Sequence, residues 1–120
     1  MTVRRRRRFS ATWRRCVRGE IFRLRASRGS RGHEQSGTRY AVAVQSNELT
    51  LSTLLVAPTS TAARAASFRP EVEIAGRATR VLAEQTAAVD PSRLGESVGY
   101  LSFDEVRRLD AALRIVMELR

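Results

Sequence analysis

The amino-acid sequence predicts a mainly β protein with one C-terminal helix, folded as a small, strongly bent antiparallel barrel. Short segments of alternating apolar and polar residues follow one another along most of the chain, and polar loops that contain glycine separate them. Only the last stretch has apolar residues at helical spacing. With 120 residues, the chain has room for one domain with one modest core.

The expected strands are short, and their apolar residues recur at every second position. Val72 and Ile74 show this most clearly, because glutamates stand between them and would face solvent while the two apolar side chains are buried. The segments expected to form strands are 20–26, 39–46, 51–58, 70–76 and 96–102, with 79–89 as one strand with a break or two short strands, and a turn of helix at 90–95.

The C-terminal helix is expected to run over 103–119. Ser102 and Glu105 have the spacing of a capping box, in which each side chain bonds the backbone of the other residue. The apolar stripe behind it is expected to pack on the sheet as core and not to hold a cofactor; it consists of Val106, Leu109, Leu113, Val116 and Met117.

Charge divides the chain in two. Residues 1–18 hold eight arginines and no acid, whereas the other 102 residues carry 14 arginines against 12 acids. We therefore expect an arginine-rich, disordered extension over 1–17 and a folded domain over 18–120. The extension is either an arm for RNA or a membrane surface, or a segment outside the folded unit. It is not an export signal, because the apolar stretch after the arginines is short and interrupted.

Several classes of chemistry are not predicted. The single His and single Cys cannot supply a zinc site of the usual ligand spacing, and Cys16 alone fits a reducing cytoplasm. The chain contains no phosphate-binding Walker loop, no dinucleotide fingerprint and no GxSxG motif. No run of apolar residues is long enough to span a membrane. We expect a protein without metal or organic cofactor.

Two polar loops remain as candidates for a functional site: the first covers residues 27–38 and the second covers residues 59–69. If the strands 39–46 and 51–58 pair antiparallel, the start of one lies near the end of the other, and Arg39 becomes a neighbour of Thr59. A guanidinium fork beside hydroxyl groups makes a phosphate-sized site. The same residues could equally be a solvated arginine and threonine of two loops. The loops also bring His33, Glu34, Gln35, Ser60, Thr61 and Arg64.

Residues 18–120 contain several short motifs in a fixed order. They are RGE at 18–20, GHEQSGTRY at 32–40, AVAVQSN at 41–47, VAPTST at 56–61, LAEQTAAVD at 82–90 and RLGESVGYLS at 93–102, followed by the closing helix. In these motifs and their order the chain resembles the MazF/PemK family of toxin endoribonucleases, although no single motif is as specific as a set of metal ligands.

This resemblance implies an SH3-like barrel of the CcdB/PemK type, usually a homodimer, in the cytoplasm. It implies an mRNA interferase that cuts single-stranded RNA (mRNA, tRNA or rRNA) at short sequences without a metal, and that a cognate antitoxin inhibits. In the implied reaction the ribose 2′-OH attacks the adjacent phosphorus and leaves a 2′,3′-cyclic phosphate and a 5′-OH.

The resemblance also implies roles for individual residues. Arg39 matches the family's catalytic arginine, Thr59 its catalytic threonine, and Glu34 the loop glutamate, which is a better general base than an arginine because a guanidinium does not readily give up its proton. His33 is an additional candidate for proton transfer. The residues expected to bind RNA are His33, Gln35, Thr38, Tyr40, Ser60, Thr61, Arg64, Arg25 and Arg31.

The chain departs from the family pattern at a few positions. Tyr40 replaces the proline after the arginine and could stack on a base. His33 stands where serine is common, Thr38 where some members have His, and Arg23 and Arg25 where acidic or neutral residues are usual. Two alternatives therefore stay open: a barrel that binds RNA without cutting it, or an inactive family member. The loop motif with Arg39 argues against a third, the gyrase-poisoning relatives of this fold.

Overall fold

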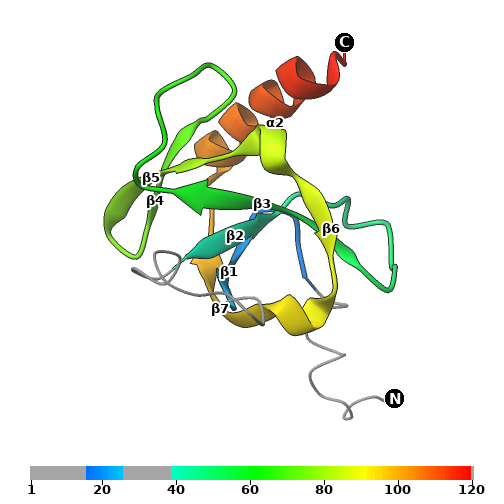
Figure 1. Cartoon of the computed structure of the whole chain (residues 1–120). Helices are drawn as coiled ribbons and strands as arrows, with labels where there is room; N and C mark the ends of the chain where they lie inside the picture. Colours follow the sequence, from blue (N-terminus) through cyan, green and yellow to red (C-terminus); the bar gives the residue numbers. More distant parts are fainter. Residues whose placement is uncertain (1–15, 26–38, 120) are drawn as a thin grey trace.

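A computed structural model describes residues 16–25 and 39–119. In this part of the chain, seven β-strands and one α-helix form the framework (Figure 1). The strands are β1 (Glu20–Leu24), β2 (Tyr40–Ala43), β3 (Leu54–Ser60), β4 (Glu71–Ile74), β5 (Arg77–Val81), β6 (Ala87–Val89) and β7 (Leu94–Tyr100), the helix is α2 (Phe103–Met117), and two 3-10 helices, η2 (Ala83–Gln85) and η3 (Pro91–Arg93), flank β6.

All strand pairs in the described residues are antiparallel, and they form one strongly bent sheet. Its strand order is β4-β5-β3-β2-β1-β7, and β6 also pairs with β3. β3 carries the bend, because residues 54–56 pair with β6 and 56–58 with β2, whereas its last two residues pair with β5. The result is a half-barrel with a C-terminal helix, as the sequence predicts (Figure 1).

The centre of the sheet is buried on both faces. Val42 and Val44 of the β2 segment belong to a cluster that includes Leu109 and Leu113 of α2, so the helix covers this face. Ala41 and Ala43 point to the opposite face, with Phe22, Leu54, Val56 and Leu94.

Several element boundaries differ from those predicted. The segment 79–89 is two short strands, β5 and β6, separated by η2, which was one of the two expected forms. The last strand begins at Leu94, because the predicted helical turn at 90–95 is only the 3-10 helix η3. The Asp90 side chain caps it by accepting a hydrogen bond of 2.8 Å from the backbone N–H of Ser92.

The capping box of α2 is confirmed. Ser102 Oγ accepts from the Glu105 N–H at 3.1 Å, and Glu105 Oε1 accepts from the Ser102 N–H at 2.8 Å. The stripe is core only as far as Leu113. Val116 and Met117 are 37% and 48% exposed, because the last turn of α2 extends beyond the sheet. Within the described residues, no helix has the length and apolar character needed to cross a membrane.

The RGE motif, Arg18 to Glu20, connects α2 to β1 and to the end of β2. The Arg18 guanidinium lies 2.6 Å from Asp110 of α2 and donates through Nε to the Val44 carbonyl at 3.0 Å. Gly19 has a φ of +94°, and a Cβ there would lie 3.1 Å from Val106 of the helix, so glycine is required at this position. The RGE motif thus serves the scaffold.

Replacing Ser102 with alanine should lower the free energy of unfolding by about 1 kcal/mol, because the Glu105 N–H loses its cap. Urea denaturation followed by circular dichroism measures this. Ser52→Ala, the same change at an exposed loop residue, serves as the control and should leave the midpoint within error. Equal midpoints for Ser102→Ala and wild type would contradict the role assigned to the box.

Candidate active site

The start of β2 and the end of β3 lie side by side, as the sequence predicts. Ala41 pairs with Pro58, and this register brings Tyr40 opposite Thr59. The Thr59 hydroxyl donates a hydrogen bond of 3.2 Å to the Tyr40 carbonyl, and the residue is only 4% exposed. Arg39 precedes Tyr40 directly, and its carbonyl accepts from the Leu24 N–H at 2.9 Å. The two predicted catalytic residues of the described chain therefore belong to one rim of the sheet.

Arg39 and Thr59 differ in how accessible they are. Arg39 is exposed, so its guanidinium can meet a ligand from solvent. Thr59 is buried, and its hydroxyl hydrogen is already used by the Tyr40 carbonyl. The oxygen of that hydroxyl can still accept a hydrogen bond, but it can donate to a phosphate oxygen only by releasing the carbonyl.

Five of the predicted site residues lie outside the described part of the chain. They belong to the first polar loop and are Arg31, His33, Glu34, Gln35 and Thr38. In the described part of the chain, the candidate site therefore consists of residues from the β1 segment, β2, β3 and the second loop.

The second loop presents polar side chains next to the end of β3. Thr61 and Arg64 are exposed, while Ser60 uses its hydroxyl oxygen to accept from the Ala62 N–H at 3.2 Å. Arg25 lies on the side of β2 away from this loop, just beyond β1, and donates through Nε to the Leu94 carbonyl at 3.2 Å. Thr61, Arg64 and Arg25 are thus accessible to a ligand, but they are not one compact cluster.

An ion pair that sequence reasoning missed fixes the second loop. Arg69 at the end of the loop donates to Glu84 Oε2 through Nε at 2.9 Å and through Nη2 at 2.6 Å. Its Nη1 also donates to the Arg64 carbonyl at 3.3 Å. These bonds tie the loop to η2 and lower the pKa of Glu84, mainly through the Arg69 hydrogen bond. The LAEQ motif drew attention to Glu84, but no nearby residue in the sequence identified Arg69 as the partner of its carboxylate.

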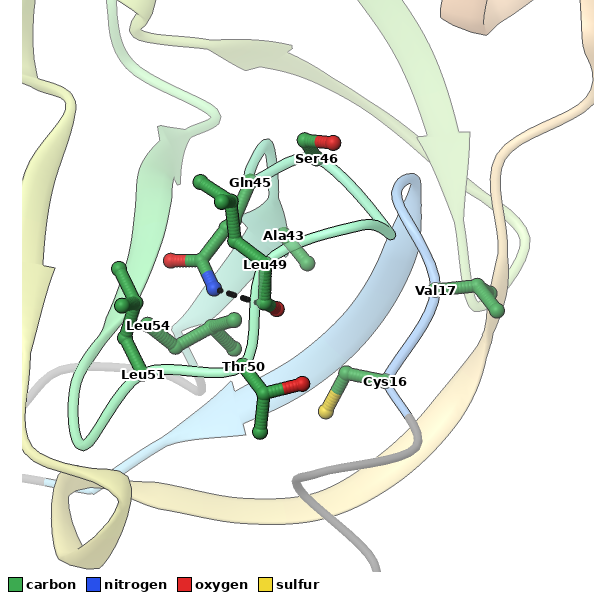
Figure 2. A pocket seen from close by; sticks show the side chains of 9 residues that line it. All are labelled: Cys16, Val17, Ala43, Gln45, Ser46, Leu49, Thr50, Leu51 and Leu54. Atoms are coloured by element: carbon green, nitrogen blue, oxygen red, sulfur yellow. Dashed lines mark hydrogen bonds between the residues drawn. The ribbon is translucent and has the colours of Figure 1, made fainter.

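A pocket lies at the other end of β2, away from Arg39. Figure 2 shows Cys16, Gln45 and Leu49 around it, with the Gln45 amide donating to the Leu49 carbonyl at 3.4 Å. The space is about 300 Å³, part of it open to solvent. Burial, together with the charge of nearby Glu20, raises the pKa of the Cys16 thiol to about 11, so the thiol is protonated at neutral pH and a poor nucleophile.

The described residues contain no candidate metal site. Across 16–25 and 39–119, no three His, Cys, Asp or Glu side chains come together in a way that could hold a metal ion. What the described rim offers is hydrogen-bond donors and positive charge, which suit a phosphate or a nucleic acid.

The chain is similar in sequence and in fold to several known proteins. Residues 17–117 match the family model described as the PemK-like, MazF-like toxin of type II toxin–antitoxin systems. A candidate toxin of Mycobacterium tuberculosis, Rv3098A, is 38% identical over 98 residues, which cover 81% of this chain and 92% of that protein.

Two solved structures share the fold. One is an endoribonuclease from a mycobacterial species in complex with its cognate antitoxin, with a TM-score of 0.69 at 16% identity, covering 88% of this chain and 97% of that one. The other is the M. tuberculosis toxin MazF-mt6, with a TM-score of 0.68 at 18% identity, covering 84% and 98% of the two chains.

The bent antiparallel sheet with its C-terminal helix is thus the architecture of a class of small toxins from type II toxin–antitoxin systems. Within that class, this chain belongs to the PemK/MazF family, because the family model matches it over most of its length. The family match begins at residue 17, close to the predicted start of the domain.

Replacing Glu84 with glutamine should destabilise the protein at pH 7 but not in acid. Because the fold lowers the pKa of Glu84 from 4.5, the ionised carboxylate stabilises the folded state above pH 4.5, and this contribution is lost as pH falls through the lower folded value. The expected loss is about 1 kcal/mol at pH 7. Urea midpoints at pH 7 and pH 3 measure it, with Glu48→Gln in an exposed loop as control. An equal deficit at both pH values would contradict the ion pair's role.

Proposed function

We propose that this protein is a toxin endoribonuclease that cleaves single-stranded RNA. The observation that carries the proposal is the pairing of Tyr40 with Thr59, which brings an exposed arginine and a hydroxyl to one rim of the sheet. Membership of the PemK/MazF family supports it. So does the strongly basic chain, whose formal charge of +10 favours a polyanionic partner.

In the proposed reaction the RNA supplies its own nucleophile. The ribose 2′-OH attacks the adjacent phosphorus, the bond to the 5′-oxygen of the next nucleotide breaks, and the products are a 2′,3′-cyclic phosphate and a 5′-OH. Negative charge builds up on the phosphorane oxygens, and the Arg39 guanidinium is proposed to stabilise it by donating hydrogen bonds. No metal is needed to generate the nucleophile.

The proton steps fall to other groups. Glu34 is the proposed base that takes the 2′-OH proton, and the same proton is proposed to pass to the leaving 5′-oxygen, which becomes the 5′-OH. His33 is the second candidate for carrying this proton. Thr59 is proposed to hold a phosphate oxygen after its hydroxyl turns away from the Tyr40 carbonyl. The proposed contacts to the rest of the RNA are Gln35, Thr38, Tyr40, Ser60, Thr61, Arg64, Arg25 and Arg31.

A protein partner is also proposed. A similar solved endoribonuclease is bound to its cognate antitoxin, which supports an antitoxin for this chain. Family resemblance supports a homodimer that works in the cytoplasm, where the RNA is. The last turn of α2 and the segment just after it agree with a protein contact, since Ile115, Met117 and Leu119 are about half exposed.

One observation favours a second candidate, an RNA-binding barrel that does not cut. Thr59 is buried and its hydroxyl already has an acceptor, so its part in catalysis needs a rearrangement on RNA binding. If that rearrangement does not occur, the basic rim would still bind single strands.

Incubation of the purified protein with a defined single-stranded transcript in EDTA tests the proposal. Cleavage should persist in EDTA and yield 2′,3′-cyclic phosphate ends. Arg39→Ala should lower the rate about 10²–10³-fold, because one preorganised donor to the phosphorane is lost.

Two further variants sharpen this test. Arg77→Ala removes an exposed arginine at the start of β5 and should cleave like wild type. Thr59→Val keeps the shape of the side chain and removes the hydroxyl, so full activity would exclude Thr59 from the reaction. RNA binding without cleavage by the wild-type protein would favour the non-cutting barrel.

The N-terminal arginines should strengthen RNA binding. Removing residues 1–15 leaves every described residue in place, and it should weaken binding and flatten the plot of log affinity against log salt concentration, by about 0.7 per lost phosphate contact. A chain of full length with Arg4 to Arg8 replaced by glutamine should behave like the deletion if charge is the cause. Unchanged affinity in both variants would show that the segment has no part in RNA binding.

A further inference from the structure

A row of polar side chains crosses one face of the sheet beside Thr59. Arg23 of β1 pairs directly with Tyr40 of β2, and its guanidinium carbon lies 5.9 Å from the centre of the Tyr40 ring. On the other side of Arg23, its Nε lies 3.1 Å from Glu96 Oε2 of β7. The row therefore runs from Glu96 through Arg23 and Tyr40 to Thr59, across four neighbouring strands.

The strands are distorted in a way that orients Arg23. Between Phe22 and Leu24 the pairing of β1 with β7 shifts, so that β7 has one extra residue opposite Arg23. Gly95 lies at this bulge, and a Cβ there would be only 3.2 Å from the Arg23 Cβ. Glycine thus allows β7 to approach closely enough for Glu96 to reach Arg23.

The ion pair contributes little to folding. The side chains of Arg23 and Glu96 are 44% and 69% exposed, and pairs as exposed as this stabilise a protein by about 0–1 kcal/mol. Among residues 16–25 and 39–119, the two terminal NH2 groups of Arg23 and Glu96 Oε1 make no further hydrogen bond, so they can bind a ligand. The pair presents donors and acceptors side by side to solvent, next to an aromatic ring.

We propose that Tyr40, Arg23 and Glu96 form a subsite that reads a guanine base of the RNA strand beside the scissile phosphate. This inference rests on the proposed function for its position in the reaction, but base recognition itself does not require cleavage. Arg23 and Glu96 are then specificity-determining residues, and neither is a catalytic residue.

Guanine fits this arrangement better than the other bases. Its Watson–Crick edge carries the O6 acceptor beside the N1–H and N2–H donors, so a guanidinium can donate to O6 while a carboxylate accepts from the two N–H groups. Unpaired RNA bases are commonly read on this edge while an aromatic or guanidinium plane stacks on the ring. Adenine and cytosine place a donor where guanine has O6, and uracil has only one N–H for the carboxylate.

Equilibrium binding of uncleavable RNA tests the proposal. The probes are fluorescein-labelled 2′-O-methyl hexanucleotides. One strand is all uridine, and each of the other three has a central guanosine, adenosine or cytidine in a uridine strand. Fluorescence anisotropy gives the dissociation constants. Wild type should prefer the guanosine strand about tenfold. Glu96→Gln and Arg23→Gln should each reduce that preference to about twofold while binding of the all-uridine strand changes little.

The β4–β5 hairpin offers a matched control. Glu71 of β4 pairs with Arg80 of β5, and Arg80 Nη2 lies 3.5 Å from the Glu71 carboxylate. Glu71→Gln should therefore keep the guanosine preference. Thermal melting of every variant shows whether it is folded, and the weak stabilising effect of the Arg23–Glu96 pair predicts melting near wild type.

The outcomes separate this inference from the proposed function. Loss of guanosine preference in both variants supports the subsite even if the wild-type protein never cuts RNA. A wild type without guanosine preference overturns the subsite, and so does an equal loss of affinity for all strands in Arg23→Gln, which would make Arg23 a phosphate contact. In either case cleavage in EDTA would still support the ribonuclease.

Discussion

The antiparallel pairing of β2 with β3 is the constraint on which the candidate site depends. At one end it gives Thr59 the Tyr40 carbonyl as partner, and at the other end Gln45 Oε1 accepts from the Leu55 N–H at 3.1 Å. A slip of one residue would move every side chain of β2 to the opposite face, exchanging valines for alanines in two different cores. Burial on both faces therefore sets the register, and the register sets the position of Arg39.

The scaffold and the chemistry use different residues of the same motifs. Arg18 connects β2 to α2, and its N–H donates to Asn47 Oδ1 at 2.7 Å, so two of the family-like motifs bind each other at the end of β2 remote from the site. Arg69 and Glu84 fix the second loop in a similar way. Such supports matter because a reaction that relies on positioning loses rate when its groups move by about 1 Å.

The row of side chains on β7, β1 and β2 is exposed to solvent, unlike the contacts that support the scaffold. Arg23 and Glu96 are not needed to fill the core, yet a bulge and a glycine bring them together. Bulges commonly re-aim side chains near functional sites. The rim thus combines a buried centre with accessible polar groups.

Much of the fold follows from local patterns that the sequence displays. The alternation around Val72, the capping box at Ser102 and the helical stripe predict their elements, because each depends on residues a few positions apart. Strand ends were less predictable: β7 starts two residues early because η3 is shorter than a helical turn. Val116 was expected in the core and is exposed, since the sequence does not show where the sheet ends beneath the helix.

For the site, the sequence by itself determined which chemical groups are present: an arginine at the start of one strand, a threonine at the end of the next and an excess of positive charge. Only the tertiary structure decided that Thr59 is buried against a carbonyl and that Arg23 meets Glu96, 73 residues away in the chain. The physical reason is that local periodicity selects an element and its faces, whereas contacts between distant residues depend on strand register, and register is set by how all the strands pack together.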